Sequence, residues 1–267
     1  MRGPVFWLGE QRLGGHPAFR LGRTKNELVA EWPGICSFSA DRATGVSEMT
    51  SEAGVDPLFV EKVHRGLAQA LLRHLAGKLT LHASAVAFDR RAIACFGESE
   101  SGKSTTMAHL SRLPGAEFFA DDTLAIEFTE NGIDIVPTEK LSWLRPEAHA
   151  SLGHGDVTAK SPVSPPRAAA TTARLASLVN LRFEEGAPSP RLRRLRGHDA
   201  LSALVPSVVR FIIDEPAVQL LECEQLTSLV SAVPVFELTR ARNLGGLEKS
   251  AELVLSLLSF TRTSDDP

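Results

Sequence analysis

Nine consecutive residues of this 267-residue chain, Gly97 to Thr105, have the types and spacing of a phosphate-binding loop. They match the pattern G-x-x-x-x-G-K-[ST] without a mismatch. Glycines at Gly97 and Gly102 allow backbone conformations that turn several N–H groups towards one phosphate. Lys103 can then reach the β- and γ-phosphates, and the Ser104 hydroxyl can ligate Mg²⁺. The loop therefore predicts a site for ATP and Mg²⁺, with these nucleotide-binding residues: Gly97, Glu98, Ser99, Glu100, Ser101, Gly102, Lys103, Ser104 and Thr105.

A pair of neighbouring carboxylates, Asp121 and Asp122, follows an apolar stretch about twenty residues after the loop. An apolar strand that ends here places both at the carboxyl edge of a sheet, where open α/β sheets bind nucleotides. In phosphoryl transfer one carboxylate holds Mg²⁺, and another can accept the proton of an attacking hydroxyl. A simple nucleotide hydrolase needs only the first, so the pair favours a kinase. A solvated Asp-Asp turn is the alternative.

The segments that flank the loop have the patterns that its function requires. Residues 92–96 before it are apolar, as in a strand buried on both faces, and residues 102–113 after it are typical of a helix. An ordinary glycine-serine turn would not need these neighbours. Further segments predict strands at 79–88, 117–120, 123–128, 133–136, 174–183 and 191–196, and helices from Asp199 to about Val209 and from Leu247 to about Leu258.

The N-terminal part of the chain has a different texture. Short apolar clusters between glycine-containing turns predict a small β-rich subdomain over residues 1–55. Asp56 is a good N-cap and Pro57 a good first helical residue, so a connecting helix is predicted over 56–78. Residues 79–267 form the predicted main domain. Within it, residues 153–172 are rich in Pro, Ala, Ser and Thr and predict a flexible loop, either a lid or an insertion without function.

Composition excludes several classes of protein. The 29 basic and 32 acidic residues leave a formal net charge of −3, so no overall field attracts nucleic acid or an anionic membrane. Any bound anion must be held by a local device such as the loop. Three cysteines lie far apart, which argues against a disulfide framework or a zinc site and suits a reducing compartment. A cytoplasmic protein is the expectation.

Other residues have two interpretations each. Arg240 and Arg242 could reach phosphates and stabilise charge in a transition state, or they form a solvated basic turn. The arginine-rich segment 191–196 is either the exposed face of an edge strand or a docking patch for an acidic peptide. Trp143 either lines the acceptor site or packs in the core.

Three stretches together resemble the C-terminal domain of the HPr kinase/phosphorylase family: Leu81-His82-Ala83-Ser84-Ala85-Val86, the loop at 97–104, and Ala120-Asp121-Asp122. They look closer still to the shorter HPr-kinase-like proteins that are often associated with bacterial peptide-modification systems. His82 precedes Gly97 by about fifteen residues, which is the separation in that family. The resemblance covers the chain from about residue 79 to the C-terminus and includes Val233-Pro234-Val235 and Arg240-Ala241-Arg242-Asn243.

The resemblance implies an α/β fold of the phosphoenolpyruvate carboxykinase/HPr kinase type, with a P-loop on a mixed sheet. It also implies ATP, Mg²⁺ and a hydroxyl acceptor, usually a serine of a protein or peptide. By position, Asp121 matches the family's general base and Asp122 a metal ligand, although the sequence leaves these two roles open. His82 would lie beside the phosphates and the acidic pair.

Two departures from the family pattern bear on the substrate. Thr105 stands where true HPr kinases carry Glu, and their glycine-rich signature after the acidic pair is replaced by residues 137–146. Reverse phosphorylase activity, and HPr as acceptor, are therefore not expected.

The sequence as a whole predicts an ATP- and Mg²⁺-dependent kinase that acts on a Ser or Thr hydroxyl of a peptide or protein. Its candidate catalytic residues are Lys103, Asp121, His82 and Arg242, with Ser104 and Asp122 at the metal. A small-molecule hydroxyl kinase and a non-catalytic nucleotide-binding partner protein are the alternatives. No nucleic-acid or membrane partner is expected, and a homo-oligomer is compatible with the sequence.

Overall fold

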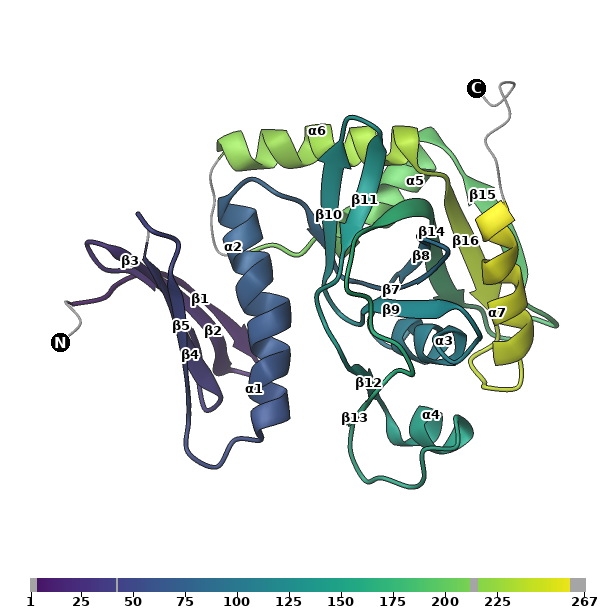
Figure 1. Cartoon of the computed structure of the whole chain (residues 1–267), viewed down its shortest axis with the longest axis horizontal. Coiled ribbons are helices and arrows are strands. Elements are labelled where there is room, and N and C mark those ends of the chain that lie inside the picture. Colours follow the sequence, from purple (N-terminus) through teal and green to yellow (C-terminus); the bar gives the residue numbers. More distant parts are fainter. Residues whose placement is uncertain (1–3, 42, 212–215, 260–267) are drawn as a thin grey trace.

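The structure, a computed structural model, describes residues 4–41, 43–211 and 216–259. An antiparallel sheet at the N-terminus is followed by one long helical segment and then by a larger mixed sheet covered by helices (Figure 1). The larger sheet carries the loop at 97–105 that is predicted to bind phosphate.

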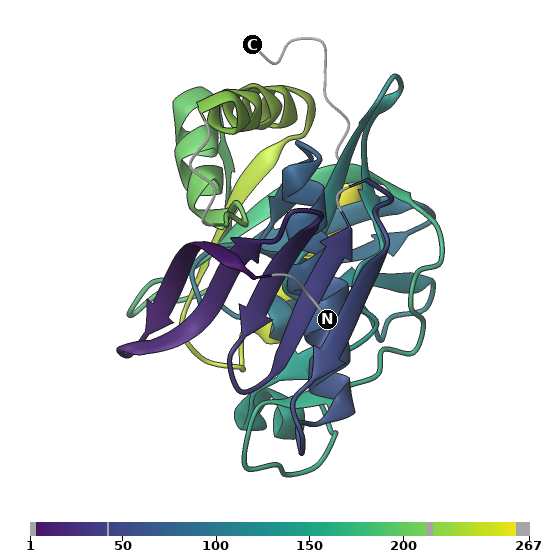
Figure 2. The ribbon, with the colours of Figure 1, turned by 90° about the vertical axis from the view of Figure 1, so that its left-hand side faces the viewer.

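The N-terminal sheet is a simple meander in which each strand pairs with the next. The turn between its first two strands contains Gly14 and Gly15, both at positive φ, as a tight hairpin requires. One face of this sheet lies against the helix that follows (Figure 2). Leu21, Trp32 and Phe38 belong to the apolar cluster between them. Its strands are β1 (Phe6–Leu13), β2 (His16–Arg23), β3 (Glu27–Trp32), β4 (Cys36–Asp41) and β5 (Ser47–Ser51).

The connecting helical segment lies between the two sheets. Asp56 caps it, its side chain accepting the Leu58 N–H at 2.9 Å, and Pro57 is its first residue, as the sequence indicates. The segment is not uniform, because one stretch has π-helical hydrogen bonds. Its parts are α1 (Pro57–Val63), the π-helical η1 (His64–Ala68) and α2 (Gln69–Leu75).

The larger sheet is mixed, as predicted. The long central strand β14 runs parallel to β8 and β16, and the other pairs are antiparallel. Its strands are β6 (Thr80–Leu81), β7 (Ala83–Phe88), β8 (Arg91–Phe96), β9 (Ala116–Ala120), β10 (Leu124–Thr129), β11 (Gly132–Val136), β14 (Ala173–Phe183), β15 (Arg191–Leu195) and β16 (Val235–Arg240).

Helices cover both faces of this sheet. One face packs against α3 (Lys103–Leu110), α7 (Leu247–Ser256) and the short η3 (Leu257–Ser259) through Met107, Leu110 and Val254. The other, lined by small residues such as Ala85 and Ala94, packs against α5 and α6. The remaining elements are α5 (Gly197–Leu204), η2 (Val205–Ser207), α6 (Pro216–Ala232), α4 (Pro146–Ser151), and the two-stranded ribbon of β12 (Ser142–Leu144) and β13 (Ser161–Val163).

Several local predictions need correction. The helix expected from Asp199 begins two residues earlier, at Gly197, so Asp199 lies in its first turn. Helix α6 was not expected from the sequence. The segment 153–172 contains β13, and Ala168 forms a bridge with Phe118 of β9, so part of it is tied to the sheets. Arg191–Leu195 is a strand paired with β16, as expected.

The sheet topology brings the predicted site residues to one edge. β8, β9, β14 and β16 all end there, and β7, antiparallel to β8, begins there. Consequently the loop after β8, the acidic pair after β9, His82 before β7 and Arg240 at the end of β16 meet at this edge. Among the described residues, no helix is long and apolar enough to cross a membrane.

Candidate active site

The loop between β8 and α3 has the backbone of a phosphate cradle. Gly97 and Gly102 have φ values of 131° and 91°, and Glu100 has a φ of 67°. A Cβ at Gly97 would lie 2.7 Å from the Leu181 carbonyl oxygen of the neighbouring strand, so only glycine fits there. Gly102 precedes α3 without a side-chain cap, which leaves N–H groups of the first turn for an anion.

Lys103 is the first residue of α3, and its side chain folds over its own loop. Its Nζ donates to the carbonyl oxygens of Gly97 at 3.0 Å and Glu98 at 2.9 Å. Burial lowers the pKa of Lys103, whereas the charges of Asp122 and Asp121 oppose that shift. The ammonium group is therefore held at the mouth of the loop by two neutral acceptors, which a phosphate can replace.

Arg240 supports the loop from behind. It is 3% exposed, and its guanidinium donates to the Ser101 carbonyl oxygen at 3.2 Å and to Thr106 Oγ1 at 3.3 Å. It also stacks on the Phe183 ring, 5.3 Å from the centroid. A Cβ at Gly102 would lie 2.2 Å from an Arg240 nitrogen, so this glycine allows the arginine to pack against the loop. Arg240 thus braces the loop.

Two exposed arginines hold the tip of the loop. Glu100 accepts from Arg242 at 2.9 Å and from Arg145, which comes from the start of α4. Arg242 lies over the same Phe183 ring at 5.6 Å. These contacts place both guanidinium groups at the tip of the loop. The predicted role of Arg242 in stabilising phosphate charge stays a prediction.

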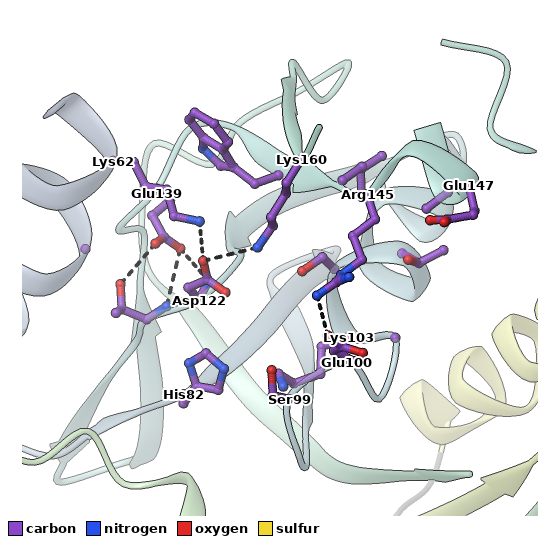
Figure 3. A pocket seen from close by; sticks show the side chains of 18 of the residues that line it. Lys62, His82, Ser99, Glu100, Lys103, Asp122, Glu139, Arg145, Glu147 and Lys160 are labelled. Carbon is purple, nitrogen blue, oxygen red and sulfur yellow. Dashed lines mark hydrogen bonds and ion pairs between the residues drawn. The ribbon is translucent and has the colours of Figure 1, made fainter. Parts of the chain in front are cut away.

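The two aspartates that follow β9 point in different directions. Asp121 is 0% exposed and accepts the Trp143 N–H at 2.7 Å, and its carboxylate also neighbours the Ser104 side chain. Burial and the charge of Asp122 raise the pKa of Asp121 to about 6. Asp122 instead faces the cavity in front of the loop (Figure 3). The residue predicted to be the base is therefore the buried one.

Asp122 is surrounded by cations. Lys62 of α1 forms an ion pair with it, and Lys160 approaches the same oxygen at 3.9 Å (Figure 3). Burial would raise the pKa of Asp122, but Lys62 and Lys160 outweigh burial and hold it below the usual value. His82 lies beside it and hydrogen-bonds its backbone. Burial and the charge of Lys103 lower the pKa of His82, which favours the neutral imidazole.

Glu139 organises the turn that carries both aspartates. One of its oxygens accepts the backbone N–H groups of Asp121 at 2.6 Å, Asp122 at 2.8 Å and Thr123 at 3.3 Å. The residue is 5% exposed. Burial, together with the charges of Asp121 and Asp122, raises the pKa of Glu139 to about 7. Its role is to fix the backbone direction of the acidic turn.

These groups surround a cavity of about 850 Å³. That volume lies within the range of small-molecule sites, about 300–1,000 Å³. Gly97, Glu98 and Ser101 do not line it, and the Ser101 hydroxyl is buried with no hydrogen-bond partner among the described residues. Predicted residues that do line it are His82, Ser99, Glu100, Gly102, Lys103, Ser104, Thr105, Asp122, Trp143, Arg240 and Arg242.

Several charged residues of the cavity, among them Lys62, Glu139 and Lys160, were not predicted from the sequence, because none of them belongs to a motif. One signal was available for Lys62: Gly66 stands one turn later in a predicted helix, and an internal glycine often marks a close approach. Within the described residues, no group of three or more His, Cys, Asp or Glu residues could hold a metal ion by itself.

Comparison with known proteins assigns neither a family nor a function to this chain. No protein-family model matches the chain, and no curated protein matches it significantly. Among solved structures it is similar to the Hpr(Ser) kinase/phosphatase from Coxiella burnetii, with a TM-score of 0.38 and 14% identity over 66% of this chain and 88% of that one. At this distance the similarity assigns no role to any residue.

Proposed function

We propose that this protein is an ATP- and Mg²⁺-dependent phosphotransferase that moves the γ-phosphoryl group to a hydroxyl, that of a Ser or Thr in a peptide or protein. One observation carries the proposal: a complete phosphate-binding loop and a second, cavity-facing carboxylate share one cavity. Lys103, Ser104 and Asp122 all line this cavity. A protein that only binds a nucleotide has no need of Asp122 in this position.

The loop binds the nucleotide phosphates through its backbone N–H groups, the start of α3 and Lys103. On binding, Lys103 exchanges the carbonyl oxygens of Gly97 and Glu98 for phosphate oxygens, which form stronger, charge-assisted hydrogen bonds. Exposed Arg242 adds positive charge at the entrance.

The residues present also fit Mg²⁺. Ser104 lines the cavity and its side chain neighbours the Asp121 carboxylate, so two oxygen ligands stand together beside the phosphate site. Such a set suits Mg²⁺, which binds proteins through one or two carboxylates and takes its other ligands from phosphates and water. When bound, Mg²⁺ neutralises charge on the phosphate oxygens. We therefore assign Ser104 and Asp121 to the metal.

Asp122 then takes the role of base. The acceptor hydroxyl gives its proton to the Asp122 carboxylate while its oxygen forms a bond to the γ-phosphorus. The bond from that phosphorus to the bridging oxygen breaks, and its electron pair remains on ADP. This exchanges the two roles that the sequence suggested, because Asp121 is fully buried and Asp122 faces the cavity. His82 hydrogen-bonds the backbone of Asp122 and so helps to fix the turn that carries this carboxylate.

A transfer assay tests the proposal. The protein is incubated with γ-labelled ATP and Mg²⁺ against two acceptor sets: a pool of short peptides with one central Ser or Thr, and a panel of L-serine, L-threonine, glycerol and glucose. Label in the peptide pool is the expected result. Label only in the small-molecule panel favours the other kinase class, and tight ATP binding without transfer to any acceptor would overturn the proposal.

A further inference from the structure

The wall of the cavity opposite the phosphate loop belongs to the helix that precedes the main domain. Phe59, Lys62 and Val63 of α1 and Gly66 and Leu67 of η1 all line it. The phosphate-binding motif lies entirely in residues 97–104, and the acidic pair is Asp121 and Asp122. Neither of them requires the N-terminal helix to face the site.

Lys62 is the residue of this wall that reaches the reacting groups. Its side chain is 16% exposed and forms an ion pair with Asp122 (Figure 3). Its Nζ also lies 5.2 Å from the centroid of the Trp143 ring, within the range of a cation–π contact. Ordering a lysine side chain in this way costs rotamer freedom, so its two partners define a specific position.

The aromatic partner of Lys62 is itself fixed. The Trp143 ring packs edge-on against Phe59, with centroids 5.8 Å apart. The backbone N–H of Trp143 donates to Asp121 at 2.7 Å. Lys62 thus rests on a residue that also holds the other aspartate, which connects α1 to both carboxylates.

The helix approaches the acidic turn at backbone distance one turn after Lys62. A Cβ at Gly66 would lie 2.9 Å from Glu139 Oε1 and 3.3 Å from Thr123 Oγ1. Gly66 lies in the π-helical stretch, and such stretches occur frequently at functional sites. The contact of Lys62 with Asp122 is therefore part of a close-packed interface.

Other charged groups near Asp122 are placed differently. Lys160 is 3.9 Å from Asp122 and has a 44% exposed side chain, and Lys103 is bound to its own loop. Of these lysines, only Lys62 joins burial to an ion pair with the carboxylate. The groups that act on Asp122 from the surrounding elements are Lys62, His82, Lys103, Asp121, Glu139 and Lys160.

We propose that Lys62 is a positioning residue that holds the Asp122 carboxylate towards the acceptor hydroxyl, so that the N-terminal helix completes the active site. This inference rests on the proposed function. It assigns to residues before the main domain a part in the transfer step itself: without Lys62, the nucleotide still binds to the loop, but the carboxylate no longer stays where the proton leaves the acceptor.

The first test compares Lys62→Met and Lys62→Arg with Arg65→Met, using Mg²⁺-ATP and the Ser/Thr peptide pool. Arg65 lies on the same helical segment in an exposed ion pair with Glu61, which makes it a matched control. We expect kcat of Lys62→Met to fall by about 10²-fold, the effect of a small misplacement at a reacting centre. The KM for ATP should change little, Lys62→Arg should recover part of kcat, and Arg65→Met should match the wild type.

A double variant separates positioning from folding. Lys62→Met leaves Asp122 without its main partner, whereas Lys62→Met combined with Asp122→Asn removes both charges. If Lys62 acts through Asp122, adding Lys62→Met to Asp122→Asn leaves the residual kcat unchanged, while a general structural role lowers it further.

The outcomes distinguish the two proposals. An active wild type in which Lys62→Met behaves like Arg65→Met, or loses ATP affinity as much as kcat, overturns this inference and leaves the proposed function standing. A further loss of kcat in the double variant also overturns it. A wild type that transfers no phosphate overturns the proposed function and this inference with it.

Discussion

Replacement of Glu139 by Gln gives a sharp test of how the acidic turn is built. Glu139 is buried, and one oxygen accepts three backbone N–H groups from Asp121, Asp122 and Thr123. A glutamine has nearly the same shape, and its carbonyl oxygen can accept the same hydrogen bonds. Its amide can donate to Thr123 Oγ1, which lies 3.3 Å from the other oxygen. Glu139→Gln therefore removes a charge while it keeps the turn.

The sign and size of the effect follow from the pKa of Glu139. Its ordinary value of 4.5 is raised to about 7 in the folded protein. Below pH 4.5 the Glu139 carboxyl is protonated in both the folded and the unfolded state. Between pH 4.5 and about 7 it is protonated only in the folded state, so the free energy of unfolding falls as the pH rises through this range. A difference of this size corresponds to about 3 kcal/mol. Glutamine does not titrate, so the stability of the Glu139→Gln variant relative to wild type should increase by about 2–3 kcal/mol from pH 5 to pH 8.

Urea denaturation followed by circular dichroism at pH 5 and pH 8 measures this difference. Glu127→Gln is the matched control, since the hydrogen bonds from Arg73 and Lys78 overcome burial and lower the pKa of Glu127. A lowered pKa gives a stabilising contribution that is almost complete once the pH exceeds the ordinary value of 4.5, so the stability difference between this control and wild type should stay nearly constant from pH 5 to pH 8. A stability difference between Glu139→Gln and wild type that does not change with pH would refute the assignment of a buried carboxyl with a raised pKa to this turn.

Two further predictions follow from the loop and the helix. Lys103→Ala should weaken Mg²⁺-ATP binding by about 10- to 150-fold, as expected for a lost charged hydrogen bond worth about 1.5–3 kcal/mol, with the fold retained; titration calorimetry showing wild-type affinity would contradict this. Gly66→Ala should destabilise the protein by about 1–3 kcal/mol because its Cβ would meet Glu139 at 2.9 Å. Gly245→Ala, where the nearest atom is 3.5 Å away, should cost less, and equal thermal stabilities would count against the close approach of η1.

The strand–loop–helix unit around the phosphate site could be predicted because its information is local. Gly97, Gly102 and Lys103 define the loop within a few residues, and the apolar segment before them needs only to be a buried strand. Asp121 and Asp122 were found for the same reason, since the strand before them ends at the edge where the loop lies. Their orientations were not predictable, because Trp143 and Lys62 decide them from distant positions.

The missed features depend on contacts between distant residues or lack a periodic signal. Lys62 and Asp122 are 60 residues apart in the sequence, and Glu139 binds a turn that precedes it by 16 to 18 residues. Helix α6 was not predicted because apolar residues lie on several of its faces. Leu220 and Leu221 are exposed, whereas Leu226 and Leu229 are buried. Its residues therefore show no single amphipathic stripe that would have predicted a helix.

Phosphorus NMR of one reaction tests the central claim most directly. Wild-type protein, ATP, Mg²⁺ and the Ser/Thr peptide pool are mixed, and ADP, phosphoester and inorganic phosphate are followed together. We expect ADP to appear with an equal amount of new phosphoester, and we expect Lys103→Ala and Asp122→Asn to slow the appearance of both signals together. ADP accompanied only by inorganic phosphate, or no ADP at all, would contradict a phosphotransferase acting on a peptide hydroxyl.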